Sequence, residues 1–222
     1  MKIAIDCFYE SISKVNEAVC GDRVIYSYDQ HGFLCVLADG LGSGVKANIL
    51  ATMTATILHR LITENIPLKE AIVTLSATLP QCKVRNIAYS TFSLLQIDED
   101  GKAVLVEFDN PAVHVIRNQQ VLHIDKQTQH YDERTIYYSE FEVLENDVVV
   151  MISDGVLFAG KGNTLNFGWQ EIDMLNHLIN STSMDDSAQA IGEYLISSVN
   201  RLYECKPQDD ATVVICKIKK QT

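Results

Sequence analysis

The chain has 222 residues, of which 47% are hydrophobic, and its formal net charge at pH 7 is -11. This length and apolar content suffice for one sizeable core, so we expect residues 1–222 to form a single domain. The negative charge argues against nucleic acid or an anionic membrane as a partner. The sequence contains neither a signal peptide nor a run of about 18 apolar residues, which predicts a soluble, cytoplasmic protein.

The first half of the chain predicts strands followed by two helices. The expected elements are a strand over 2–8, a turn or short helix over 11–19, an antiparallel hairpin of 22–28 with 33–39, and helices over 44–64 and 68–79, the second ending before Pro80. Apolar residues in the first helix recur at spacings of three or four, which predicts a stripe that faces the core: Leu50, Met53, Ile57 and Leu61.

The second half predicts a run of strands, two helices and a last strand. The expected elements are hairpins of 89–98 with 102–108 and of 113–116 with 121–124, a loop over 125–135, strands over 136–143 and 148–153, a loop over 160–168, a helix over 170–179, a helix that opens with a capping box at Ser183 and Asp186, and a strand over 211–218. Strand runs separated by helix pairs indicate antiparallel sheets with helices outside, hence an α+β fold.

The first hairpin carries an acid on each strand at its open end. Its turn is centred between Gln30 and His31, so the numbers of antiparallel partners sum to 61. Asp22 and Asp39 satisfy this sum. We therefore expect their carboxylates to lie opposite each other, with about 5 Å between the two Cα atoms.

Two further acids occupy similar places downstream. Asp154 ends the buried strand over 148–153, and Asp209 precedes the last strand. Since the end of one antiparallel strand meets the start of the next, all four acids can converge at one edge of the sheets. Clustered carboxylates repel one another, and divalent cations remove that repulsion. An all-oxygen ligand set favours Mg²⁺ or Mn²⁺ over zinc. Asp-Gly is also a frequent turn dipeptide, so ordinary turns remain the alternative interpretation at this point.

Four motifs in chain order carry a resemblance to a known family. They are Cys20-Gly21-Asp22, then Ala38-Asp39-Gly40-Leu41-Gly42-Ser43-Gly44, then Ser153-Asp154-Gly155-Val156, and finally Asp209-Asp210-Ala211-Thr212-Val213-Val214. Together they resemble the motifs of the metal-dependent PPM (PP2C-type) serine/threonine phosphatases. Within that family they are most similar to the stage II sporulation E-like branch, and there to the short feedback phosphatase of bacterial stress-response partner switching. The resemblance spans Asp22 to Val214.

The resemblance implies a fold and an activity. The fold would be a four-layer α-β-β-α sandwich of two antiparallel sheets flanked by helix pairs. Two Mn²⁺ or Mg²⁺ ions would be bound, with Asp39 bridging them. Asp22 and the Gly40 carbonyl would serve one ion, and Asp154 and Asp209 the other. Asp22 and Asp39 are the expected catalytic residues. Water activated by both metals would hydrolyse phosphoserine or phosphothreonine in a phosphoprotein, with a bacterial partner-switching regulator as the expected substrate.

The chain departs from the family pattern at three places. Leu41 stands where eukaryotic members carry a histidine that is a candidate general acid, and Asp109 replaces a glycine before Asn110-Pro111. The family's N-terminal phosphate-binding arginine has no match. Two other functions stay open: a non-catalytic pseudophosphatase that binds a phosphoprotein, and a hydrolase of small phosphate esters.

Overall fold

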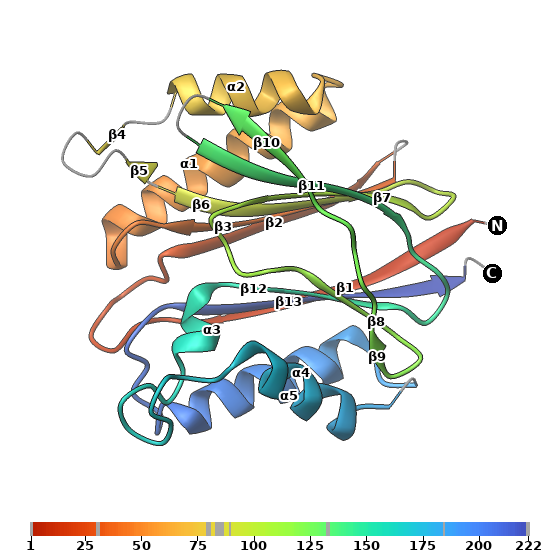
Figure 1. Ribbon diagram of the computed structural model, residues 1–222. Helices are drawn as coiled ribbons and strands as arrows, with labels where there is room; N and C mark the ends of the chain where they lie inside the picture. The colour runs from red at the N-terminus through yellow and green to blue at the C-terminus, as the bar shows by residue number, and fades with distance from the viewer. Residues whose placement is uncertain are drawn as a thin grey trace.

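Two β-sheets are stacked face to face, with helices on both outer sides, as Figure 1 shows. The computed structural model describes residues 2–29, 32–78, 81–82, 87–88, 90–131, 134–183 and 185–220. Both chain ends lie at one end of the sandwich (Figure 1). Among the described helices, none combines the length and the apolar character that crossing a membrane requires.

Each large sheet is antiparallel at its described pairings. In spatial order, the first sheet contains β1 (Ile3–Ile12), β13 (Ala211–Lys220), β12 (Val148–Ile152), β8 (His114–Arg117) and β9 (Gln120–Val121). The second contains β10 (Gln127–Tyr131), β11 (Arg134–Glu142), β7 (Lys102–Phe108), β6 (Ser90–Ile97), β3 (Gly32–Gly40) and β2 (Asp22–Asp29). A small separate pair is formed by β4 (Gln81–Cys82) and β5 (Ile87–Ala88).

The helices form the two outer layers. The second sheet is covered by α1 (Gly44–Thr63) and α2 (Leu68–Thr78), and the first by α3 (Asp154–Phe158), α4 (Glu171–Ser181) and α5 (Ala188–Leu202). Three apolar clusters separate the four layers: one between the sheets and one under each helix layer. The predicted α+β four-layer sandwich is therefore confirmed.

Three predictions in the strand regions were wrong in part, because pairing with a neighbouring strand, rather than the local sequence pattern, sets where each strand begins and ends. The strand expected over 2–8 continues to Ile12, which pairs with Ala211, and of the turn or short helix expected over 11–19 only a turn at residues 15–16 forms. The loop expected over 125–135 contains β10, a polar edge strand held by its pairing with β11. The strand expected over 121–124 is only the two-residue β9.

The helix predictions were wrong about one helix start and missed one short helix. The N-cap of α5 is Ser187, whose hydroxyl accepts from the N–H of Ala190, whereas Asp186 closes a turn by accepting from the N–H of Ser183. The sequence did not predict α3. Parts of three expected elements fall outside the described residues: the hairpin turn at Gln30 and His31, the end of the second helix at Leu79 and Pro80, and the strand start at Tyr89.

The buried face of α1 is not the predicted stripe. Met53 is 38% exposed, whereas the fully buried apolar positions of α1 are Leu58 and three small residues, Ala47, Ala51 and Ala55, each at 0%. Small side chains let the helix axis approach β3 closely, and the larger Ile57 and Leu61 pack beside this contact. The predicted stripe was chosen from large apolar residues, whereas the closest contact between α1 and β3 is made by the smallest ones.

Enlarging a small residue of this contact should destabilise the fold. We expect Ala51→Leu to lower the free energy of unfolding by about 1–3 kcal/mol, since a close-packed contact cannot accept extra methyl groups without strain. The matched variant Met53→Leu should change it by less than about 0.5 kcal/mol. Urea unfolding of both variants is the measurement. A sensitive Met53 with a tolerant Ala51 would restore the originally predicted stripe.

Candidate active site

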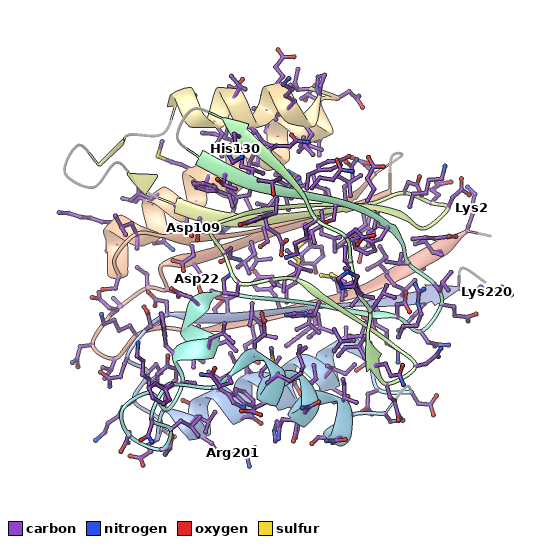
Figure 2. All side chains as sticks on the ribbon, viewed as in Figure 1. Lys2, Asp22, Asp109, His130, Arg201 and Lys220 are labelled. Atoms are coloured by element: carbon purple, nitrogen blue, oxygen red, sulfur yellow. The ribbon has the colours of Figure 1, made fainter. Side chains whose placement is uncertain are left out.

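The inward-facing rows of the second sheet become acidic at one end of the sandwich. Along β3, alternate residues point between the sheets, and the apolar row that includes Leu37 is followed by Asp39. Along β2, Val24 is preceded by Asp22 in the same way. Asp22 and Asp39 are direct antiparallel partners, which confirms the predicted register. This end lies opposite the one that carries Lys2 and Lys220 (Figure 2).

The first sheet contributes its acids through a tight contact between two segments. Asp154 is the first residue of α3 rather than the end of β12, which stops at Ile152. A Cβ atom on Gly155 would lie 2.0 Å from the backbone oxygen of Asp210. Only glycine permits this approach, and it brings the start of α3 against the residues that precede β13. Asp154 and Asp209 therefore reach the same end of the sandwich.

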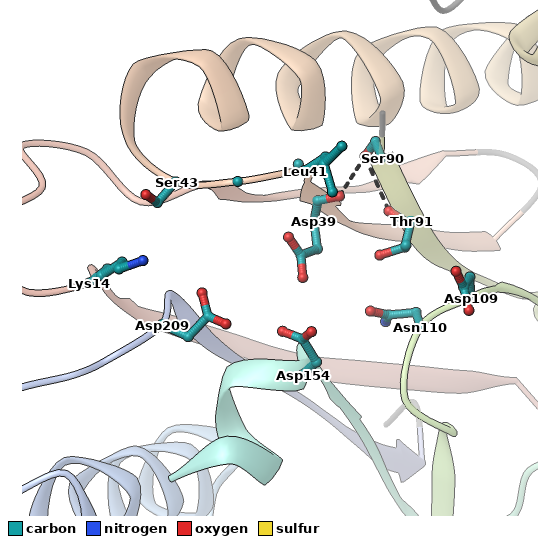
Figure 3. Close-up of a pocket in the computed structure, with 12 residues that line it drawn as sticks. Lys14, Asp39, Leu41, Ser43, Ser90, Thr91, Asp109, Asn110, Asp154 and Asp209 are labelled. Carbon is teal, nitrogen blue, oxygen red and sulfur yellow. Dashed lines mark hydrogen bonds between the residues drawn. The ribbon is translucent and has the colours of Figure 1, made fainter. Parts of the chain in front are cut away.

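A second close approach fixes the backbone around Asp39. A Cβ atom on Gly40 would lie 2.0 Å from the carbonyl oxygen of Ala47 in the first turns of α1. The hydroxyl of Ser90 donates to the carbonyl of Asp39 at 2.9 Å (Figure 3). The end of β3 is thus held between α1 and β6, and the Asp39 side chain is left to face the first sheet.

Three of the predicted acids line one pocket. Asp39, Asp154 and Asp209 point toward one another across it (Figure 3). The pocket measures about 580 Å³ and is lined by Lys14, Asp39, Gly40, Leu41, Gly42, Ser43, Ser90, Thr91, Asp109, Asn110, Asp154 and Asp209. Of these twelve described residues, Lys14 alone carries a cationic side chain, and none is a histidine.

The fourth acid lies behind the pocket. Asp22 is 5% exposed and is not one of the lining residues. Its Oδ2 atom accepts hydrogen bonds of 2.7 Å from the hydroxyls of Ser153 and Thr212. Its Oδ1 atom is buried and has no hydrogen-bond partner. The structure thus gathers three acids at the pocket surface and places the fourth within the protein, where one oxygen is unused.

Burial raises the pKa of every acid in this group, and repulsion from neighbouring carboxylates adds to it. For Asp39, burial raises the pKa to about 9, with further rises from the charges of Asp22, Asp154 and Asp209. Burial likewise raises the pKa values of Asp154 and Asp209, and that of Asp22 to about 6 despite its two hydroxyl donors. Without a compensating positive charge, these carboxylates cannot all be ionised together near neutral pH.

The donor set is suited to hard divalent cations. The side chains that face the pocket centre offer carboxylate oxygens, and the unpaired Asp22 Oδ1 adds a buried oxygen with no other partner. The nearby Cys20 thiol is held neutral, because burial raises its pKa to about 12. In the described part of the chain, no three acidic, thiol or imidazole side chains are arranged closely enough to coordinate one ion.

Sequence reasoning missed the residues that complete the pocket. Lys14 lies in the irregular segment after β1, where its backbone N–H donates to Asp210 Oδ1 at 2.9 Å. Asn110 donates to Ser93 Oγ and to the carbonyl of Ile152, which joins the two sheets beside the acids. Neither residue has a sequence pattern that marks it, although Asn110 belongs to the segment that resembled the family.

Asp109 adds an acid at the pocket rim. It adopts a left-handed backbone conformation with φ of +48°, which is uncommon for a residue with a side chain. The glycine that the family usually has here would adopt it without strain. Asp109 thus takes a conformation suited to glycine and brings a carboxylate to the rim (Figure 3).

Comparisons with known proteins identify the fold. A family model described as Stage II sporulation protein E (SpoIIE) matches residues 29–219. The phosphatase domain of SpoIIE from Bacillus subtilis is 21% identical, with a TM-score of 0.74 over 100% of this chain and 95% of that chain. RsbX in complex with magnesium is 15% identical, with a TM-score of 0.68 over 97% and 96%. A Mycobacterium tuberculosis structure of RsbU and RsbW domains is 14% identical, with a TM-score of 0.78 over 100% and 62%. No curated protein sequence matches the chain. The fold is of the PP2C type.

The metal-free protein should lose stability as the pH rises. Asp39 has a pKa of about 9 when folded and an ordinary value of 3.8. Between these values the folded chain holds a proton that the unfolded chain has released, so the free energy of unfolding falls with increasing pH. The contribution is complete below about pH 4 and lost through about pH 9. Urea unfolding with a chelator should show this slope.

Two variants identify the source of that slope. Asp39→Asn should flatten it, because the amide cannot ionise, whereas Asp125→Asn at a fully exposed site should leave it unchanged. Adding Mn²⁺ should reverse the loss at high pH, since a cation stabilises the ionised acids. A wild-type stability that rises between about pH 6 and about pH 9 in chelator would contradict the assignment.

Proposed function

We propose that this chain, which belongs to the stage II sporulation protein E family, is a metal-dependent protein serine/threonine phosphatase. The observation that carries the proposal is the pocket at the end of the sandwich, where Asp39, Asp154 and Asp209 face one another. Carboxylates that are this mutually destabilising are what a pair of divalent cations would neutralise.

The proposed ligand assignment follows the position of each acid. Asp39 faces Asp154 and Asp209 from the opposite side of the pocket and would bridge two ions. The Gly40 carbonyl and the unpaired oxygen of Asp22 would serve one ion, the latter through water, and Asp154 and Asp209 would hold the other. Bound Mn²⁺ or Mg²⁺ would supply an activated water nucleophile near neutral pH and would offset charge on the phosphoryl oxygens.

The remaining pocket residues suggest how a phosphoryl group is received. Lys14 offers the pocket's one cationic side chain, and its anchored backbone keeps it beside Asp209. We assign it the capture of the phosphate dianion. Leu41, 42% exposed at the rim, leaves the position of the family's histidine without a proton donor. Proton delivery to the departing serine or threonine oxygen is therefore assigned to water.

The proposed substrate is a phosphorylated protein, specifically a bacterial partner-switching regulator. Support comes from the sequence motifs, which resemble those of the stress-response feedback phosphatase. It also comes from the similarity of the whole fold to a structure that contains RsbU and RsbW domains. The open pocket, with the apolar Leu41 at its rim, is compatible with a protein surface that presents a phosphorylated residue.

Hydrolysis should depend on Mn²⁺ and on Asp39. We expect Asp39→Asn to reduce turnover of p-nitrophenyl phosphate and of a phosphoserine protein by about 10³-fold or more, because a bridging carboxylate is lost. Asp125→Asn is the matched control and should retain wild-type rates. Full activity in excess chelator would refute metal dependence. Mn²⁺ binding without turnover of any ester would instead identify a pseudophosphatase, and turnover confined to small esters would identify the metabolite hydrolase.

Lys14 should affect substrate binding more than turnover. We expect Lys14→Met to raise the KM for a phosphoprotein by about tenfold with a smaller change in kcat, since a charge-assisted contact to phosphate is lost. Lys14→Arg should retain most of the affinity. Lys46→Met, which removes an exposed cation of α1 outside the pocket, is the control. An unchanged KM in Lys14→Met would remove Lys14 from the site.

A further inference from the structure

Two buried hydroxyls hold the one acid that does not reach the pocket. Ser153 and Thr212, which we call the hydroxyl clamp, both donate to Asp22 Oδ2 at 2.7 Å. Both are 0% exposed, and Asp22 is 5% exposed. All three lie on inward-facing positions at the acidic end of the sandwich, in line with the apolar rows between the sheets.

When Asp22 is ionised, the donor of each hydrogen bond in the clamp can be assigned. An ionised carboxylate only accepts, so each hydroxyl gives its single proton to Asp22. Ser153 Oγ must then accept, and it does so from the N–H of Thr212 at 2.9 Å. Thr212 Oγ1 must accept as well, and its partner at 2.7 Å is Ser11 Oγ, which therefore donates. The network is satisfied throughout except at one atom, Asp22 Oδ1.

The clamp joins the two halves of the proposed metal site. Asp22 belongs to β2 and is paired with Asp39, whereas Ser153 and Thr212 belong to the other sheet. Ser153 immediately precedes Asp154, and Thr212 follows Asp209 by three residues. Each of these two short segments thus places an acid in the pocket and a hydroxyl on Asp22.

We propose that Ser153 and Thr212 are positioning residues that hold Asp22 with its Oδ1 atom free for the cation site, an inference that rests on the proposed function. A purely structural buried acid would be satisfied at both oxygens, because an unpaired buried oxygen is costly. Here both donors converge on Oδ2, and Oδ1 is left without one. The clamp sets the distance between the sheets at the point where the acids must act together.

The test separates the hydroxyl of Thr212 from its methyl group. Thr212→Val keeps the shape and removes the donor, whereas Thr212→Ser keeps the donor and removes a buried methyl. Mn²⁺ affinity of each intact protein is measured by titration followed with electron paramagnetic resonance, and stability by urea unfolding in chelator. We expect Thr212→Val and Ser153→Ala to weaken Mn²⁺ binding by about 10-fold to 100-fold, and Thr212→Ser to stay within about twofold of wild type.

Matched controls remove buried hydroxyls elsewhere. Ser139→Ala and Thr54→Val alter buried residues that do not contact Asp22 and should leave Mn²⁺ affinity unchanged. Equal Mn²⁺ affinity in Thr212→Val and wild type would refute the positioning role of the hydroxyl clamp. An equal loss of Mn²⁺ affinity in Thr212→Ser and Thr212→Val would refute it as well. If Thr212→Val does not fold, Ser153→Ala decides by the same measurement. A wild-type protein that binds no Mn²⁺ would overturn the proposed function and the clamp together, whereas normal wild-type binding with unaffected variants overturns the clamp alone.

Discussion

The repulsion among four clustered carboxylates is the main cost that the rest of the structure must offset. Asp22, Asp39, Asp154 and Asp209 all have raised pKa values, with burial as the first cause. Such a cluster opposes folding unless the surrounding core offsets its cost. The apolar layers between the sheets and under both helix pairs supply that stabilisation, and they extend to the acidic end of the sandwich. The acids sit where the apolar rows stop, close enough to be desolvated yet open to a pocket.

The site belongs to neither sheet alone, and this ties its formation to closure of the sandwich. Asp39 comes from one sheet and Asp154 from the helix that follows a strand of the other. Close backbone approaches at Gly40 and Gly155 fix each half locally, because a side chain at either position would strike a neighbouring carbonyl oxygen. Asn110 and the hydroxyls on Asp22 then connect the halves. Local geometry therefore aims each acid, and contacts between the sheets bring the acids together.

The parts of this arrangement that were predictable are those decided by nearby residues. The Asp22 and Asp39 pairing follows from hairpin arithmetic because a short turn fixes the register. The layer order follows from the alternation of strand runs and helix pairs. The predicted buried face of α1 was wrong because its close contact with β3 is made by alanines, which carry little periodic signal. The β10 strand was missed because its polar sequence depends on β11 for pairing. Lys14 had no pattern at all, since tertiary folding alone brings it to the pocket.

Under the proposed function, an acidic chain must bind a phosphorylated partner, and the pocket suggests how the charge repulsion between them is overcome. The formal charge is -11, and the pocket holds four carboxylates against a single lysine. Without cations, ionised acids at this spacing repel a phosphate dianion, since like charges in a partly desolvated site interact strongly. Two divalent ions would reverse the sign of the local field and leave the distant acidic surface unchanged. Under the proposed function, cation binding thus precedes productive phosphate binding, and Lys14 contributes only after the acids around it are neutralised. On this proposal, the pocket would repel phosphate without metal and bind it once the ions are present.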